Sequence, residues 1–222
     1  MRRAAMLAAL VVGCGRADDG ARRSGGDREN RQTTTDGCPD TSRPDPARLR
    51  RVLARLSGVA TTASFPARIE AAGVVLCSGP EPTERTAGNP LVVDSLRSDE
   101  EAAARVVHAL VHVEAARGPG RDAPVDCAVA ATELVAEEAR ALDAELTVRE
   151  ALGAWRHGVD VAVRAAWAAA DPEDRLDVLV EWLEAAPDNA AGVDVDVPAF
   201  VARCEQGRRE RAERLEPRRP AR

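Results

Sequence analysis

The chain has 222 residues, of which 45% are hydrophobic and 2% aromatic, and its formal net charge is −6 at pH 7. This length suits one compact domain with flexible ends, and a core built from Ala, Val and Leu favours helices over strands. The negative charge argues against a nucleic-acid partner, because phosphate binding requires a basic face.

The first residues, "MRRAAMLAALVVGC", predict an export signal. Two arginines precede an apolar run of about ten residues, which is too short to span a membrane permanently. The ending Val-Val-Gly-Cys resembles the lipobox of bacterial lipoproteins, whose cysteine is lipidated and begins the mature chain. We therefore expect a signal peptide over residues 1–13 and a membrane anchor on Cys14, in the bacterial cell envelope. The alternatives are an ordinary signal peptide or a buried apolar N-terminus.

Residues 14–44 have almost nothing to bury and predict a disordered tether. The folded domain is expected over residues 45–215, followed by a disordered tail over 216–222. An exported protein with an even number of cysteines after Cys14 is expected to form disulfides, here two in any of three pairings. The four candidates are Cys38, Cys77, Cys127 and Cys204.

The first elements of the domain are predicted to be a helix, a hairpin and a strand. Asp45 caps a helix that stops at Gly58. Residues 67–79 alternate loosely around Gly73 and predict a short hairpin, and residues 90–96 predict another short strand.

The rest of the chain is predicted to be helical. Ser98 and Glu101 form a capping box for a helix that runs to about residue 117. A long helical pattern covers residues 125–155, and three shorter helices follow at 159–170, 171–187 and 196–215. The fold class is therefore α+β and mostly helical, with a small sheet packed ahead of a two-helix core.

His108 and His112 stand four residues apart in a chain with three histidines. On a helical wheel they lie opposite the apolar stripe of their helix, among small alanine side chains. Two imidazoles one turn apart can reach a single metal ion. The alternative is a pair of buried histidines satisfied by hydrogen bonds.

The long helix offers a third ligand for such an ion. Glu138 and Glu145 fall in the middle of its buried stripe, whereas Glu137 points to the flank. A buried carboxylate is costly unless it is paired, protonated or bound to metal. Glu138 is the expected metal ligand, and the alternative is an ion pair with Arg105 or Arg149.

Residues 67–155 resemble the gluzincin group of zincin-type metallopeptidases. The resemblance lies in the order of the elements: a strand, then "SDEEAAARVVHALVHVEAARG", then "CAVAATELVAEEARALDAELTVREALG". In that group H-E-x-x-H supplies two zinc ligands and the catalytic base, and a glutamate on a later helix supplies the third ligand. The resemblance implies a zinc site of His108, His112 and Glu138.

The chain departs from the gluzincin pattern at Ala109, which stands in place of the catalytic glutamate. Loss of a positioned base removes a factor of about 10²–10⁴ in rate. Glu101 lies about 10 Å along the helix from His108, and Glu137 points away, so neither replaces the base. No residue is therefore assigned a catalytic role.

The expected function is that of an envelope lipoprotein with a gluzincin-like domain that binds a peptide or protein partner and has weak or no peptidase activity. One alternative is an active zinc metallopeptidase with an unorthodox base. Another is a metal-free structural lipoprotein. His157 is either a fourth metal contact or a cap near a helix end, and the helix dipole favours the capping role.

Overall fold

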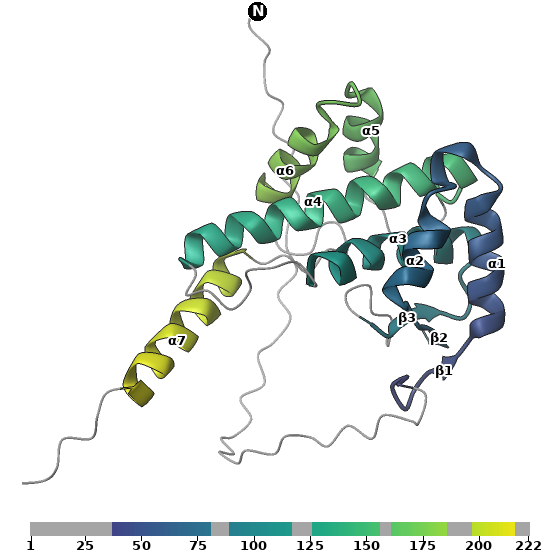
Figure 1. Ribbon diagram of the computed structural model, residues 1–222. Helices are drawn as coiled ribbons and strands as arrows, with labels where there is room; N and C mark the ends of the chain where they lie inside the picture. Colours follow the sequence, from purple (N-terminus) through teal and green to yellow (C-terminus); the bar gives the residue numbers. More distant parts are fainter. Residues whose placement is uncertain (1–36, 81–88, 117–125, 156–160, 186–196, 216–222) are drawn as a thin grey trace, which may run out of the picture. The chain divides into compact units, whose positions relative to one another are not determined.

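The computed structural model describes residues 37–80, 89–116, 126–155, 161–185 and 197–215, and it confirms a mostly helical α+β fold (Figure 1). The strands are β1 (Arg43–Pro44), β2 (Leu76–Gly79) and β3 (Leu91–Asp94). The helices are α1 (Pro46–Ser57), the 3-10 helix η1 (Ala60–Thr62), α2 (Phe65–Ala72), α3 (Asp99–Ala116), α4 (Cys127–Leu152), α5 (Val161–Ala169), α6 (Arg175–Ala185) and α7 (Val197–Leu215).

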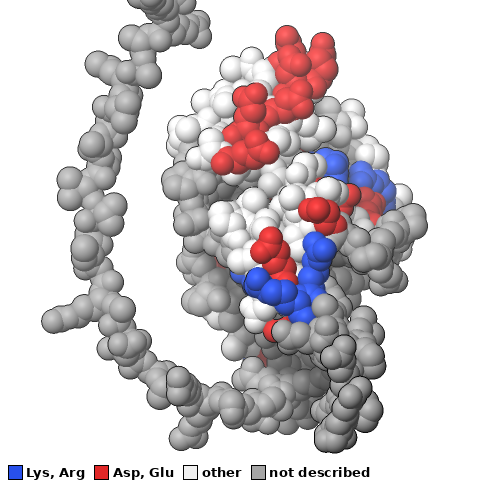
Figure 2. Space-filling view, turned by 90° about the vertical axis from the view of Figure 1, so that its left-hand side faces the viewer, with Lys and Arg blue, Asp and Glu red and all other residues white. Residues whose placement is uncertain are grey.

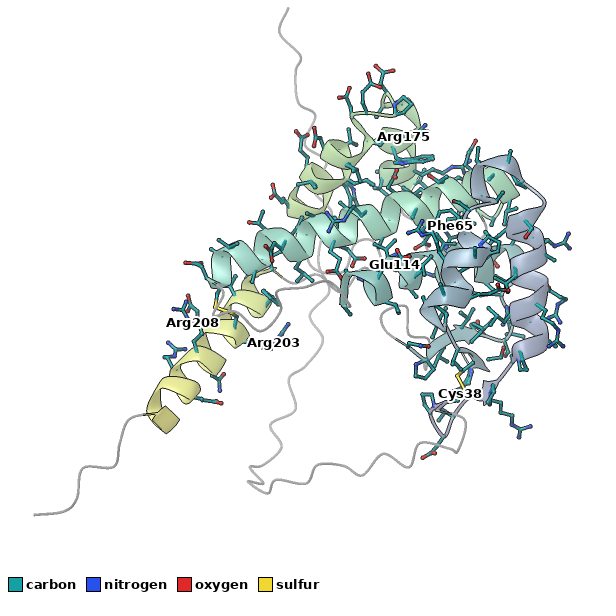
Figure 3. All side chains as sticks on the ribbon, in the orientation of Figure 1. Cys38, Phe65, Glu114, Arg175, Arg203 and Arg208 are labelled. Carbon is teal, nitrogen blue, oxygen red and sulfur yellow. A yellow bond between two sulfur atoms is a disulfide. The ribbon has the colours of Figure 1, made fainter. Side chains whose placement is uncertain are left out.

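The sheet is small and largely buried. Strand β1 pairs antiparallel with β2, and β2 pairs parallel with β3. All four residues of β3 are buried, as expected of a parallel strand covered on both faces. A disulfide joins Cys38 to Cys77, so the end of the predicted tether is tied to β2 (Figure 3).

Helix α1 begins as predicted, because the side chain of Asp45 accepts a hydrogen bond of 2.9 Å from the backbone N–H of Arg48. The hairpin predicted over residues 67–79 is wrong, since helix α2 occupies its first half. Gly73 has a left-handed φ of 61° and ends α2. The glycine that suggested a hairpin turn is therefore a helix stop, and only the second half of the stretch forms a strand.

Helix α3 is enclosed on all sides along most of its length. It begins with the predicted capping box, in which Ser98 and Glu101 exchange hydrogen bonds between side chain and backbone. Every residue from Glu101 to Leu110 is buried. A large apolar cluster combines α3 with α1, α2, β2, β3 and Val148 of α4. Polar side chains on the buried surface of α3 must therefore find partners inside the protein.

Helix α4 provides those partners, because it packs against α3, α6 and α7. A second apolar cluster joins it to α5 and α6 and includes Val135, Leu146 and Trp167. The second disulfide links Cys127, the first residue of α4, to Cys204 of α7. Among the described residues, no helix has both the length and the apolar character needed to cross a membrane.

Candidate metal centre

Donor atoms of three residues, His108, His112 and Glu138, converge between α3 and α4. Nε2 of His108 lies 3.2 Å from Nε2 of His112. Nε2 of His108 also lies 3.2 Å from Oε1 of Glu138, and Nε2 of His112 lies 3.2 Å from Oε2 of the same carboxylate. A tetrahedral ion bound at 2.0–2.1 Å from each donor would separate the donors by about 3.3 Å. The group could therefore hold a metal ion with little movement.

The donors are shielded from solvent. The exposed fractions of the side chains are 4% for His108, 9% for Glu138 and 11% for His112. His112 is thus the part of the group nearest the surface. In such a setting charge is weakly screened, so a bound cation and its ligands interact more strongly than they would in water.

A carboxylate fixes the orientation of His112. Its Nδ1 lies 2.8 Å from Oε1 of Glu137. An ionised carboxylate only accepts hydrogen bonds, so the proton of a neutral His112 ring sits on Nδ1. Its Nε2 then presents a lone pair to the group. Carboxylate partners of this kind orient metal-bound histidines.

His108 has a corresponding partner in Glu145. Its Nδ1 lies 2.9 Å from Oε2 of Glu145, although the N–H direction departs from the line that a good hydrogen bond requires. We therefore treat this contact as electrostatic. It favours a proton on Nδ1 and leaves Nε2 of a neutral His108 as an acceptor.

Two arginines surround Glu145, which is 1% exposed. Nη1 of Arg105 lies 3.3 Å from one carboxylate oxygen, and Nε of Arg149 lies 2.8 Å from the other. Arg149 also donates to the carbonyl oxygen of Ala154 over 2.7 Å. Although burial raises the pKa of a carboxyl group, the Arg105 charge and the His108 contact hold the pKa of Glu145 well below its usual range.

Two facing Nε2 lone pairs and a carboxylate repel one another unless a proton or a metal ion lies between them. With protons on both Nδ1 atoms, both Nε2 atoms are acceptors that face each other and an acidic side chain. Burial alone lowers the pKa of a histidine, but the contacts with Glu138 and Glu145 raise the pKa of His108 to about 9. Burial raises the pKa of a carboxyl, but His108 and His112 lower the pKa of Glu138 to about 2. The metal-free group therefore holds at least one proton at neutral pH. In a metal-loaded group the ion would take the place of that proton.

Ala109 lies outside this group of donors. It is fully buried and belongs to the large apolar cluster that includes Val93 of β3. The position at which gluzincins carry their base is thus packed against the core. A carboxylate there would have to displace apolar neighbours.

The structure brings together the predicted residues His108, His112 and Glu138. Glu137, which was predicted to point away from the site, contacts His112. The two arginines considered as partners of Glu138 pair instead with Glu145, and Glu101 serves the capping box. The signal for Glu145 was present, since it also falls on the buried stripe of α4. Cys14 and His157 lie outside the described residues.

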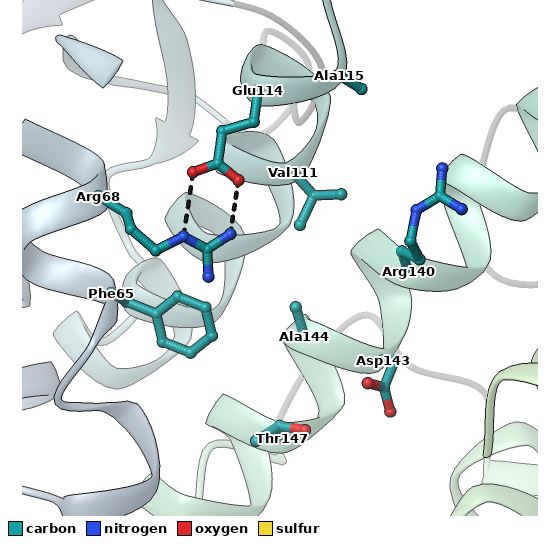
Figure 4. A pocket seen from close by; sticks show the side chains of 9 residues that line it. All are labelled: Phe65, Arg68, Val111, Glu114, Ala115, Arg140, Asp143, Ala144 and Thr147. Atoms are coloured by element: carbon teal, nitrogen blue, oxygen red, sulfur yellow. Dashed lines mark hydrogen bonds and ion pairs between the residues drawn. The ribbon is translucent and has the colours of Figure 1, made fainter. Parts of the chain in front are cut away.

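A separate pocket of about 460 Å³ lies between α2, α3 and α4 (Figure 4). Arg68 forms an ion pair with Glu114 at its edge, with Nε 3.0 Å from Oε1. Asp143 accepts a hydrogen bond of 2.7 Å from Nε1 of Trp167. None of the three donor residues lines the pocket. The pocket is therefore separate from the group of donors.

Acidic side chains also gather on the surface, along the upper part of the face in Figure 2. Helix α6 and the turn before it contribute exposed carboxylates. They belong to Asp171, Glu173, Asp174, Asp177, Glu181 and Glu184. Exposed acidic groups are common without a bound ion, so we assign them to a solvated face.

No protein-family model, curated protein or solved structure matches the chain. The gluzincin resemblance therefore rests on the residues of the chain itself.

Proposed function

We propose that this chain is a metal-binding domain of an exported lipoprotein, which binds a peptide or protein partner without cleaving it. The observation that carries the proposal is the convergence of His108, His112 and Glu138 at mutual donor distances of 3.2 Å. The carboxylate contacts on both Nδ1 atoms support it, because they are typical of metal-bound histidines.

Zinc is the ion that this donor set fits best. Zinc accepts imidazole nitrogen and carboxylate oxygen, and it is usually bound in a tetrahedron. Together, His108, His112 and Glu138 supply three of the four donors, and a water or a group of a partner would complete the tetrahedron. Held in this way, the ion joins α3 to α4.

Weak or absent peptidase activity follows from the surroundings of the donors. A zinc-bound water needs a nearby base for efficient hydrolysis, and Ala109 offers none. Two of the nearest other carboxylates, Glu137 and Glu145, contact the outer nitrogens of the histidines. Both are engaged by the histidine rings, so the proposal assigns neither of them as a base.

The same contacts favour a second function, that of a metal-free structural domain. A protonated His108 between Glu138 and Glu145 forms a cross-helix ion pair that satisfies the buried charges without an ion. The two functions differ in whether the purified protein takes up zinc.

Zinc titration separates them. The metal-free wild-type protein is expected to bind one equivalent of zinc, and the variants His108→Ala and Glu138→Gln are expected to lose that binding. The matched control is Glu133→Gln, an exposed position on the same helix, which should bind like wild type. Folded wild-type protein that takes up no zinc would overturn the proposal in favour of the structural function.

Activity is tested separately by incubating the zinc-loaded protein with a mixture of peptides and analysing the products by mass spectrometry. Intact peptides are expected. Cleavage that is lost in Glu138→Gln but retained in Glu133→Gln would contradict the assignment as a binding domain.

Export and lipidation rest on the N-terminal pattern that ends at Cys14. Residues 1–36 lie outside the described part of the chain. The two disulfides support an oxidising compartment.

A further inference from the structure

Glu145 is a buried carboxylate that is not one of the converging donors. It is enclosed by His108, Arg105 and Arg149, and the two arginine side chains are 8% and 0% exposed. Burying such a set of charges gives little net stability, since well-packed apolar side chains of similar volume often serve as well. The network therefore points to a role other than stability.

The two arginines keep Glu145 an acceptor. An acceptor beside Nδ1 of His108 favours the proton on that nitrogen and turns Nε2 toward Glu138. The contacts with Arg105 and Arg149 also restrict movement of the carboxylate. Nε2 of His108, which lies 3.2 Å from Oε1 of Glu138, is thus the nitrogen available to an ion.

The partner of the other ring is held less firmly. The side chain of Glu137 is 15% exposed, against 1% for Glu145. Water competes for the contact of Glu137 with His112, so its contribution is weaker. The two outer carboxylates should therefore differ in their effect on the site.

We propose that Glu145, clamped by Arg105 and Arg149, is a positioning residue that presents Nε2 of His108 to the metal ion. This inference rests on the proposed zinc site and adds a residue that determines the affinity of that site. It predicts that Glu145 contributes more to zinc affinity than Glu137, the carboxylate that contacts Nδ1 of His112.

The test measures the zinc dissociation constant of the full mature chain by competition with a chelator. Glu145→Gln is expected to weaken zinc binding about 10–100-fold, and Glu137→Gln is expected to weaken it less. Glu150→Gln, at an exposed position of the same helix, is the matched control and should leave affinity unchanged.

Because Glu145→Gln leaves two buried arginines without their full partner, Glu145→Asp is the second variant. It keeps the negative charge but is shorter by one methylene group, so it shortens the reach toward His108 while retaining charge for the arginines. It should also weaken zinc binding. Circular dichroism establishes that each variant compared is folded.

The absorption spectrum of the Co²⁺-loaded protein separates positioning from general destabilisation. A change in how His108 binds alters the visible bands of Co²⁺, whereas lower stability with an intact site does not. We expect altered bands in folded Glu145→Asp or Glu145→Gln protein and unaltered bands in Glu150→Gln.

Wild-type zinc affinity and an unaltered Co²⁺ spectrum in a folded Glu145 variant would overturn the positioning role and leave the zinc site in place. Failure of the wild-type protein itself to bind zinc would instead overturn the proposed function. The two failures are therefore distinguished in the same set of measurements.

Discussion

At the scale of single residues, His108 makes zinc binding depend on pH. In the metal-free protein its pKa of about 9 lies above neutral pH, so the ring is protonated and the ion must displace a proton. Zinc affinity should therefore increase as pH rises from 6 toward 9, by about tenfold per unit for one displaced proton. Chelator competition at several pH values measures this slope, and an affinity that is constant between pH 6 and 8 would contradict it.

Ala109 gives a second prediction. Because this alanine lies in the large apolar cluster, Ala109→Glu places a carboxylate among apolar side chains. We expect the free energy of unfolding to fall by about 3–5 kcal/mol and no peptidase activity to appear. Urea denaturation and the peptide assay measure the two effects. Ala116→Glu, at the exposed end of α3, is the control. Hydrolysis by a stably folded Ala109→Glu variant would show that this position faces a working site.

The sequence predicted which three side chains come together better than it predicted their surroundings. Glu138 was found because a carboxylate on an apolar stripe needs a partner, and the spacing of His108 and His112 identified the pair. The wheel placed Glu137 on the flank, but side-chain length lets it reach His112. Helical periodicity places Arg149 one turn from Glu145 on α4. It does not specify that Arg105 meets Glu145, since that depends on the axial offset of α3 against α4.

At the scale of elements, the disulfide between Cys127 and Cys204 holds α7 to α4. It spans 77 residues, and α7 contributes no donor to the candidate metal centre. Replacing both cysteines by serine should lower the free energy of unfolding by about 2–4 kcal/mol while zinc affinity stays unchanged. Thermal or urea unfolding and chelator competition test the two halves of this prediction. A large loss of zinc affinity would mean that α7 supports the site.

The long helices were predictable because capping and periodicity agree along them. Asp45, Ser98 and Glu101 all act as caps in the structure. Helix α2 was missed because its eight residues are too few to establish a helical period against the signal of Gly73. The disulfide pairing could not be predicted, because it depends on which elements become neighbours.

At the scale of the whole molecule, the N-terminal pattern predicts attachment to a membrane. Full-length protein should fractionate with membranes and incorporate a fatty-acid label, and Cys14→Ala should lose the label. Cys204→Ser is a control that removes a cysteine without touching the proposed anchor. Release of unlabelled wild-type protein into the soluble fraction would favour an ordinary signal peptide.

X-ray absorption at the zinc edge tests the central claim most directly, because it reports the atoms bound to the ion. For the zinc-loaded protein we expect two imidazole nitrogens at about 2.0–2.1 Å and carboxylate oxygen at about 2.0–2.2 Å. Because His108→Ala is expected to lose zinc binding, the imidazole signal should disappear in that variant. A zinc ion surrounded only by oxygen, or one whose spectrum is the same in His108→Ala, would contradict a site built between α3 and α4.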